Sequence, residues 1–220
     1  MRAQFVLFDG FDPLDVIAPF EVLDAGCLVT DGESTVEFVS AEGARQVPSG
    51  IPAISLEATA RLDPDRADLI LVPGAVGKLP DGPSDRRPET IPMIIARSLG
   101  TELPALLRAA VERTDTTVAT VCGGSLVLAM AGLIKGRCAT THHIAMDTLS
   151  GAGVNAVAAR VVDDGDLISG ANVTSGLDLG LYLLERELGP RIANAVEKLF
   201  AHERRGTVWR NTGRTPAIAV

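Results

Sequence analysis

Short apolar runs alternate with helix-like segments along the whole chain. Residues 3–8 and 68–73 are rich in Val, Leu, Ile and Phe, and residues 116–121 are rich in β-branched Val and Thr, which predicts buried strands. Residues 35–41 alternate as a half-buried strand does. Apolar periodicity predicts helices over 14–26, 103–113, 123–134, 143–153, 172–189 and 191–204. Hairpins are expected at 46–55 and at 156–170, the second turning at Asp164-Gly165. This order predicts an α/β fold, a mainly parallel sheet with helices on both faces.

Three segments interrupt the pattern. Pro19 stands inside the helix predicted over 14–26 and should kink or break it. Residues 77–92 combine Pro, Gly and charge, which predicts a surface loop, and residues 206–220 are typical of a loosely ordered tail. We therefore expect a single domain over 1–205, followed by a C-terminal tail over 206–220.

Composition narrows the class of protein. The 220 residues are 46% hydrophobic, enough for a sizeable core, and the net charge of −8 argues against binding to nucleic acid or to anionic lipid. Every apolar run ends well before the ~18 residues of a membrane span, and the N-terminus lacks the pattern of a signal peptide. Three cysteines without C-x-x-C spacing favour neither a disulfide framework nor a zinc site. A cytoplasmic protein with no membrane or nucleic-acid partner is expected.

One cysteine stands where a predicted strand meets a predicted helix. β-branched residues lead into Cys122, and Gly123 and Gly124 follow it. This order is typical of a nucleophile elbow, in which the nucleophile projects from a sharp turn and needs small neighbours. Free N–H groups at the helix start should lower the thiol pKa and should hold negative charge that develops on a substrate. The alternative, a small buried structural cysteine, is our interpretation of Cys27 and Cys138.

Four blocks of sequence resemble the ThiJ/PfpI superfamily, whose fold is like that of class I glutamine amidotransferases. They are LDVIAPFEVL (14–23), LILVPGAVG (69–77), VCGGSLVLAMAGLIKGRCATTHH (121–143) and LISGANVTSGLDLGLYL (167–183). Within the superfamily, the sequence is most similar to the isonitrile hydratase group. The resemblance implies a flavodoxin-like fold, a homodimer, and a lyase that hydrates a small isonitrile to an N-substituted formamide without metal or organic cofactor.

The resemblance also implies roles for particular residues. Cys122 matches the nucleophile, and Asp15 matches the catalytic carboxylate. The backbone at Gly74 and Ala75 matches the loop that faces the nucleophile, and Thr174 lies in the block that lines the pocket. A thiolate can attack a protonated isonitrile to form a thioimidate, while a carboxyl group delivers the proton and then activates water. Close to a thiolate, the Asp15 carboxyl should have a raised pKa.

Other polar residues compete for these roles. Asp15 could simply be an acid favoured by a helix N-terminus, and Glu21 on the same helix is a rival acid that we expect at the surface. His142 and His143 are candidate partners of a cysteine, with a structural or helix-capping role as the favoured alternative. Thr174 could cap a helix, together with its neighbours Asn172 and Ser175, as readily as line a pocket.

Departures from the pattern of the hydratase group bear on the substrate more than on the fold. Gly123 stands where those relatives usually carry Thr, so one hydroxyl is missing beside the nucleophile. Gly74-Ala75 replaces a common Gly-Gly, and the stretch 80–104 is longer than usual.

Three other functions are compatible with the sequence. The first is a related cysteine hydrolase, or a glyoxalase-like enzyme that acts on reactive carbonyls. The second is a ligand-sensing module like the N-terminal domain of AraC-type transcription regulators, which would need an added DNA-binding domain. The third is a redox sensor that uses an easily oxidised Cys122.

Overall fold

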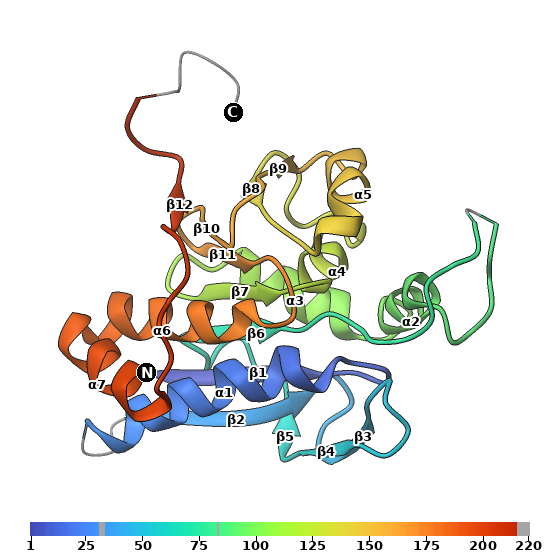
Figure 1. Ribbon diagram of the computed structural model, residues 1–220. Helices are drawn as coiled ribbons and strands as arrows, with labels where there is room; N and C mark the ends of the chain where they lie inside the picture. The colour runs from blue at the N-terminus through green and yellow to red at the C-terminus, as the bar shows by residue number, and fades with distance from the viewer. Residues whose placement is uncertain (31–33, 83, 215–220) are drawn as a thin grey trace.

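A central sheet of eight strands organises the molecule in the computed structural model, which describes residues 1–30, 34–82 and 84–214 (Figure 1). Across the sheet the strands lie in the order β12 (Trp209–Arg210), β10 (Val161–Asp163), β11 (Leu167–Gly170), β7 (Thr117–Val121), β6 (Leu69–Val72), β1 (Arg2–Leu7), β2 (Thr35–Ser40) and β5 (Ala60–Arg61).

Most of the sheet is parallel. Strands β11, β7, β6, β1, β2 and β5 all run the same way, whereas β10 is antiparallel to β11 and carries β12 beside it in parallel. The carboxyl ends of β1, β6, β7 and β11 therefore meet at one edge, where ligands bind in open α/β sheets. Two small pairs stand apart, β3 (Arg45–Pro48) with β4 (Ser55–Ala58) and β8 (Cys138–Ala139) with β9 (Asn155–Ala156).

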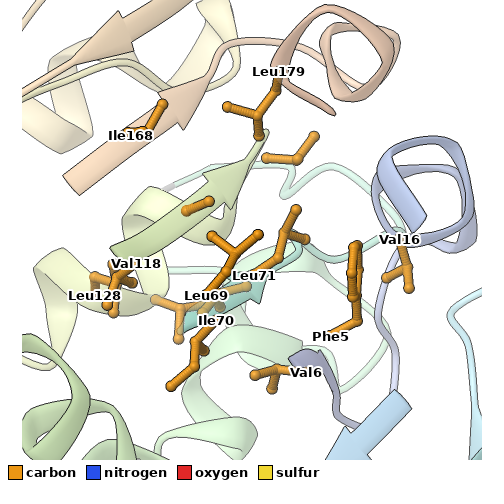
Figure 2. Packing of buried hydrophobic residues seen from close by; sticks show 14 of the residues in the cluster. Phe5, Val6, Val16, Leu69, Ile70, Leu71, Val118, Leu128, Ile168 and Leu179 are labelled. Carbon is orange, nitrogen blue, oxygen red and sulfur yellow. The ribbon is translucent and has the colours of Figure 1, made fainter. Parts of the chain in front are cut away.

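Helices cover the sheet on both sides. Helices α1 (Pro13–Leu28), α6 (Ser175–Leu188) and α7 (Pro190–Phe200) pack against one another in front of the sheet in Figure 1. The remaining helices are α2 (Ile91–Ser98), α3 (Leu103–Val111), α4 (Gly124–Met130), α5 (Met146–Gly151) and the short 3-10 helix η1 (His143–Ala145). Figure 2 shows Val16 of α1 and Leu179 of α6 on one side of the strand residues, and Leu128 of α4 on the other. The apolar runs predicted as buried strands form this core.

The structure confirms most of the predicted elements. Each predicted strand is present, both hairpins form, and the second one turns through Asp164 and Gly165 with Gly165 at φ +90°. The α/β fold class is confirmed. Helix α1 continues through Pro19, which is buried, so the break that the sequence allowed there is absent.

Two predictions were wrong in part. The loop predicted over 77–92 ends where α2 begins at Ile91, and the sequence missed that helix. Within the predicted C-terminal tail, Trp209 and Arg210 pair with β10 as strand β12, so part of this segment belongs to the sheet. Residues 215–220 of that tail lie outside the described residues. None of the helices over the described ranges combines the length and apolarity needed to cross a bilayer.

Candidate active site

Cys122 lies at a strained turn between β7 and α4. It directly follows Val121, the last residue of β7, and its φ of +54° is in the left-handed region. For a residue with a side chain this conformation costs about 1–2 kcal/mol. Helix α4 begins two residues later, at Gly124. The backbone at Cys122 therefore has the nucleophile-elbow geometry that the sequence predicted.

The small residues after Cys122 are needed because another loop passes close to them. A Cβ on Gly124 would lie 2.1 Å from the carbonyl oxygen of Val72, which no side chain could tolerate. A Cβ on Gly123 would lie 3.3 Å from the Cα of Gly74, a tight contact that a small shift could relieve. The end of β6 and the elbow are thus pressed together, as Gly-Gly predicts.

Helix α1 brings Asp15 to the same place. Asp12 caps this helix, with its side chain accepting a hydrogen bond from the N–H of Leu14 at 3.0 Å, and Asp15 follows in the first turn. The N–H of Gly74 donates to Asp15 Oδ2 at 2.9 Å, and the N–H of Asp12 donates to the Gly74 carbonyl at 3.0 Å. Gly74 therefore ties the first turn of α1 to the elbow, and a Cβ there would lie 2.5 Å from the nitrogen of Gly123.

The Cys122 thiol and the Asp15 carboxyl are interacting neighbours in a dry environment. Cys122 is 7% exposed and Asp15 is 0% exposed. Burial raises the pKa of the Asp15 carboxyl well above its ordinary value, and the charge of Asp12 adds to this, against the hydrogen bond from Gly74. Burial also raises the pKa of the Cys122 thiol, and the neighbouring Asp15 charge adds to that effect. Both raised pKa values favour the protonated forms of the pair, a thiol beside a carboxylic acid.

This result corrects one prediction and refines another. The thiol pKa is raised, not lowered as expected from the helix N-terminus, because burial outweighs the favourable N–H of Gly123. The pKa of Asp15 is raised as expected, but its main cause is burial and not a neighbouring thiolate. Burial also raises the pKa of Asp12, the half-buried cap residue nearby.

Two backbone nitrogens face the elbow. The Gly123 N–H lies against the Cys122 sulfur. Ala75 pairs with Phe11 in an antiparallel bridge whose hydrogen bonds run from Asp12 to Gly74 and from Val76 to Gly10. Since Ala75 stands between those two bonds, its own N–H points away from the bridge. Its nitrogen is 3.7 Å from where a Cβ on Gly123 would lie.

Thr174 is placed differently from the residues above. It is exposed at the start of α6 and makes no capping hydrogen bond with its side chain. Its hydroxyl and its carbonyl both accept from Arg160, at 3.3 and 2.8 Å. Arg160 in turn lines an open cavity of about 260 Å³ with Thr140, Thr141, His143, Met146, Ala158, Ala159, Ala171 and Asn172.

The histidines and Glu21 have structural or surface positions. His142 caps the 3-10 helix η1, since its Nδ1 accepts from the N–H of Ile144 at 3.4 Å. His143 contacts Asn172 through its backbone N–H, at 3.2 Å to Oδ1. Glu21 is exposed on α1. Within residues 1–30, 34–82 and 84–214, no group of three His, Cys, Asp or Glu side chains gathers as a metal ion would require.

Sequence reasoning missed two residues of this region. Asp12 was not among the candidate residues, although Asp-Pro before an apolar helix is a known signature of a helix cap followed by the first helical residue. Thr141 donates a hydrogen bond from its hydroxyl to the Cys122 carbonyl at 2.7 Å, over a separation of 19 residues. No local sequence pattern predicts that contact.

The fold and this site define an α/β protein with a cysteine at a strand-to-helix elbow, beside a buried carboxyl group. The profile of the DJ-1/PfpI family matches residues 96–186. The chain is 32% identical over 203 residues to isonitrile hydratase from Pseudomonas putida, covering 90% of this chain and 76% of that protein. It belongs to the DJ-1/PfpI family, which the sequence blocks had indicated under the name ThiJ/PfpI.

Other relatives agree with this assignment. Deglycase PfpI from Pyrococcus furiosus is 27% identical over 177 residues, covering 77% of this chain and 89% of that one. The crystal structure of a ThiJ/PfpI family protein from Pseudomonas syringae superposes with a TM-score of 0.75 at 24% identity, covering 93% of this chain and 76% of that one. At that identity the superposition supports the fold alone.

Proposed function

We propose that this protein is a cysteine-dependent hydratase that converts an isonitrile to an N-substituted formamide. The observation that carries the proposal is the buried pair of Cys122 and Asp15, in which burial raises the pKa of both groups. An isonitrile carbon reacts with a sulfur nucleophile only once it is protonated, so the site must supply an acid at neutral pH. The 32% identity to isonitrile hydratase supports the same substrate class.

The first half of the reaction forms a thioimidate. The Asp15 carboxylic acid gives its proton to the isonitrile carbon, and the sulfur of Cys122 forms a bond to the same carbon. The thiol proton passes to the Asp15 carboxylate, which restores the acid. Asp15 Oδ1 suits this transfer because it is buried and has no hydrogen-bond partner among the described side chains and backbone groups.

The second half consumes one water. The Asp15 acid protonates the nitrogen of the thioimidate, and its carboxylate takes a proton from water as the hydroxide adds to the carbon. The resulting intermediate expels the sulfur, its hydroxyl proton returns to Cys122 through Asp15, and the formamide leaves. The two halves together consume one isonitrile and one water, and they leave the Cys122 thiol and the Asp15 acid as they were.

Backbone groups complete the proposed site. The N–H groups of Gly123 and Ala75 would bind the negative charge that develops during these steps. Gly74 would act by positioning Asp15 through its hydrogen bond. We assign the substituent of the substrate to the 260 Å³ cavity, which Thr174 would affect only indirectly, through its contact with the lining residue Arg160. No metal or organic cofactor is needed by this mechanism.

We also propose the working form of the protein. The resemblance to the hydratase group implies a cytoplasmic homodimer, and the exposed apolar side chains Leu14 and Ile144, 46% and 59% exposed, give such an interface something to bury. Sedimentation should then give about twice the chain mass of 23.0 kDa. A mass equal to one chain at micromolar concentration would reject the dimer.

The test of the reaction is turnover of a simple alkyl or aryl isonitrile, followed by appearance of the formamide. Cys122→Ala should abolish turnover, and Asp15→Asn should lower kcat by about 10²–10⁴-fold. Cys138→Ala is the matched control, since Cys138 is also a buried cysteine but lies in β8. It should keep the wild-type rate.

Two results would contradict the proposal. Formamide production that survives in Cys122→Ala would remove the covalent step. A folded wild type that turns over no isonitrile, while a small thiol reagent still labels Cys122, would leave the elbow in place and discard the substrate. Reactive carbonyls would then be the next substrates, because one relative is named a deglycase.

A further inference from the structure

The elbow needs support that its own sequence does not provide. Cys122 is held at φ +54°, a conformation that an L residue with a side chain leaves readily when nothing fixes it. A change of a few tens of degrees at this residue would swing the sulfur away from Asp15. The two backbone groups of Cys122 are the places where the rest of the protein can fix the turn.

The amide side of Cys122 is fixed by the sheet. Its N–H donates to the carbonyl of Gly170 at 2.9 Å. This bond extends the parallel pairing of β7 with β11, which ends with Val121 opposite Gly170. The bond uses main-chain atoms alone, so the turn is held on this side whatever the side chains are.

The carbonyl side of Cys122 is fixed by one side chain. The hydroxyl of Thr141 donates to the Cys122 carbonyl at 2.7 Å, and Thr141 is 1% exposed. The segment that carries it is docked on β11, because the N–H of Thr140 donates to the Ser169 hydroxyl at 2.9 Å. Thr141 therefore reaches the elbow from a fixed base and not from a free loop.

We propose that Thr141 is a positioning residue for the reactive cysteine. Together with the Gly170 carbonyl, its hydroxyl clamps the backbone of Cys122 from both sides and keeps the sulfur against Asp15. Without the hydroxyl, the buried Cys122 carbonyl would lose the partner that Thr141 provides, and the turn would relax to find another. The clamp concerns the backbone of the elbow, so it does not depend on which substrate the enzyme uses.

The experiment compares Thr141→Val, which has the same shape but no donor, with Thr141→Ser, which keeps the hydroxyl. Amide hydrogen exchange of a peptide spanning 119–126 reports opening of the elbow. We expect exchange about five- to tenfold faster in Thr141→Val and near wild type in Thr141→Ser, since one buried hydrogen bond is lost in the first and kept in the second.

Thr140→Val is the matched control. Thr140 is the neighbouring residue and is equally buried, but its hydroxyl approaches the sulfur of Met146 and not the elbow. This variant should exchange like wild type. Where the isonitrile is turned over, Thr141→Val should lower kcat about tenfold or more because the sulfur is misplaced, whereas Thr141→Ser should keep the wild-type kcat.

The outcomes separate this inference from the proposed reaction. Faster exchange in Thr141→Val alone, in a protein that turns over no isonitrile, would support the clamp and reject the substrate. Unchanged exchange in a folded Thr141→Val, or equal acceleration in Thr140→Val, would overturn the clamp even if wild type is an active hydratase. A Thr141→Ser variant that behaves like Thr141→Val would also overturn it.

Discussion

At the scale of single residues, the Asp15 carboxyl keeps its proton to a higher pH than an exposed aspartate does. Burial keeps it there, and the charge on Asp12 strengthens the effect. The chemistry we propose uses that proton, so activity should be high while Asp15 is protonated and should fall as the pH rises through its pKa.

Removal of the Asp12 charge should shift this alkaline limb to lower pH. Asp12→Asn keeps a good helix cap but removes a negative charge that raises the pKa of both Asp15 and Cys122. The profile of kcat/KM against pH would show the shift directly. Glu21→Gln removes an equal charge from an exposed position of the same helix and should leave the profile where it was. A shift of the limb to higher pH would contradict the assignment of Asp15 as the acid.

The same proton costs the fold some stability at neutral and alkaline pH. Between its ordinary pKa and its raised one, Asp15 is ionised in the unfolded chain and protonated in the folded one. The folded state then binds more protons, so the free energy of unfolding falls as the pH rises towards the raised pKa. Asp15→Asn has no such slope and can still accept the hydrogen bond from Gly74. Urea unfolding should therefore show the variant gaining stability relative to wild type as the pH rises from the ordinary pKa of Asp15 towards the raised one. A constant margin would refute this prediction.

At the scale of elements, glycines let α1 and α6 pack closely. A Cβ on Gly180 would lie 2.9 Å from Val22 Cγ1 and 3.3 Å from the Cα of Pro19, both on α1. Neither neighbour can rotate away, because one is β-branched and the other is a ring residue whose contacting atom is backbone. Asp15 lies in the first turn of α1, at one end of the contact between the two helices. The spacing of the helices therefore matters for the site.

Gly180→Ala should therefore lower the free energy of unfolding by about 1–2 kcal/mol, the cost of overpacking less the gain in helix propensity. Gly151→Ala in α5 is the same substitution with nothing within 4 Å of the new Cβ. It should be neutral or stabilise by up to about 1 kcal/mol. Thermal or urea unfolding of the two variants side by side checks the opposite signs.

The sequence predicted those elements whose pattern is local. Strand β7, the elbow and α4 follow from a β-branched run, Cys-Gly-Gly and an apolar helix, and they were found in place. Helix α2 was missed because it is short, has Pro92 near its start and follows a Pro- and Gly-rich stretch. Its buried Ile94 and Ile95 were the available signal.

Long-range features of the site lay beyond the sequence. The contact of Thr141 with Cys122 joins residues 19 apart, and the raised pKa of the thiol depends on how closely three segments pack around it. The position of a helix N-terminus can be predicted from sequence, but the burial that outweighs its effect on the thiol pKa cannot. The resemblance identified Asp15 as a candidate, and the structure shows that burial is the main cause of its raised pKa.

At the scale of the whole molecule, the C-terminal segment closes one edge of the sheet. Arg210 of β12 donates to the Tyr182 hydroxyl at 3.0 Å and pairs with Asp163 at 3.2 Å. Tyr182 belongs to α6 and is 4% exposed, so the segment connects the sheet edge with a core helix. The predicted domain end at 205 can be tested against this contact.

Deletion of residues 206–220 should lower the free energy of unfolding by about 1–3 kcal/mol, since it removes β12 and the contacts of Arg210 with Asp163 and Tyr182. Arg210→Ala separates the side chain from the strand and should account for about half of the loss. Urea unfolding measures both. A deletion as stable as the full chain would show that the folding unit ends by residue 205, as the sequence predicted.

The strands at the two ends of the sheet, β12 and β5, are only two residues long, and each includes an arginine, Arg210 or Arg61. A second chain that tried to add a strand there would find few free backbone groups and a charged side chain. The two edges are thus protected against the edge-to-edge growth that leads to aggregates. Copies of this protein that associate should therefore contact one another through helices and loops, and not by extending the sheet with further strands.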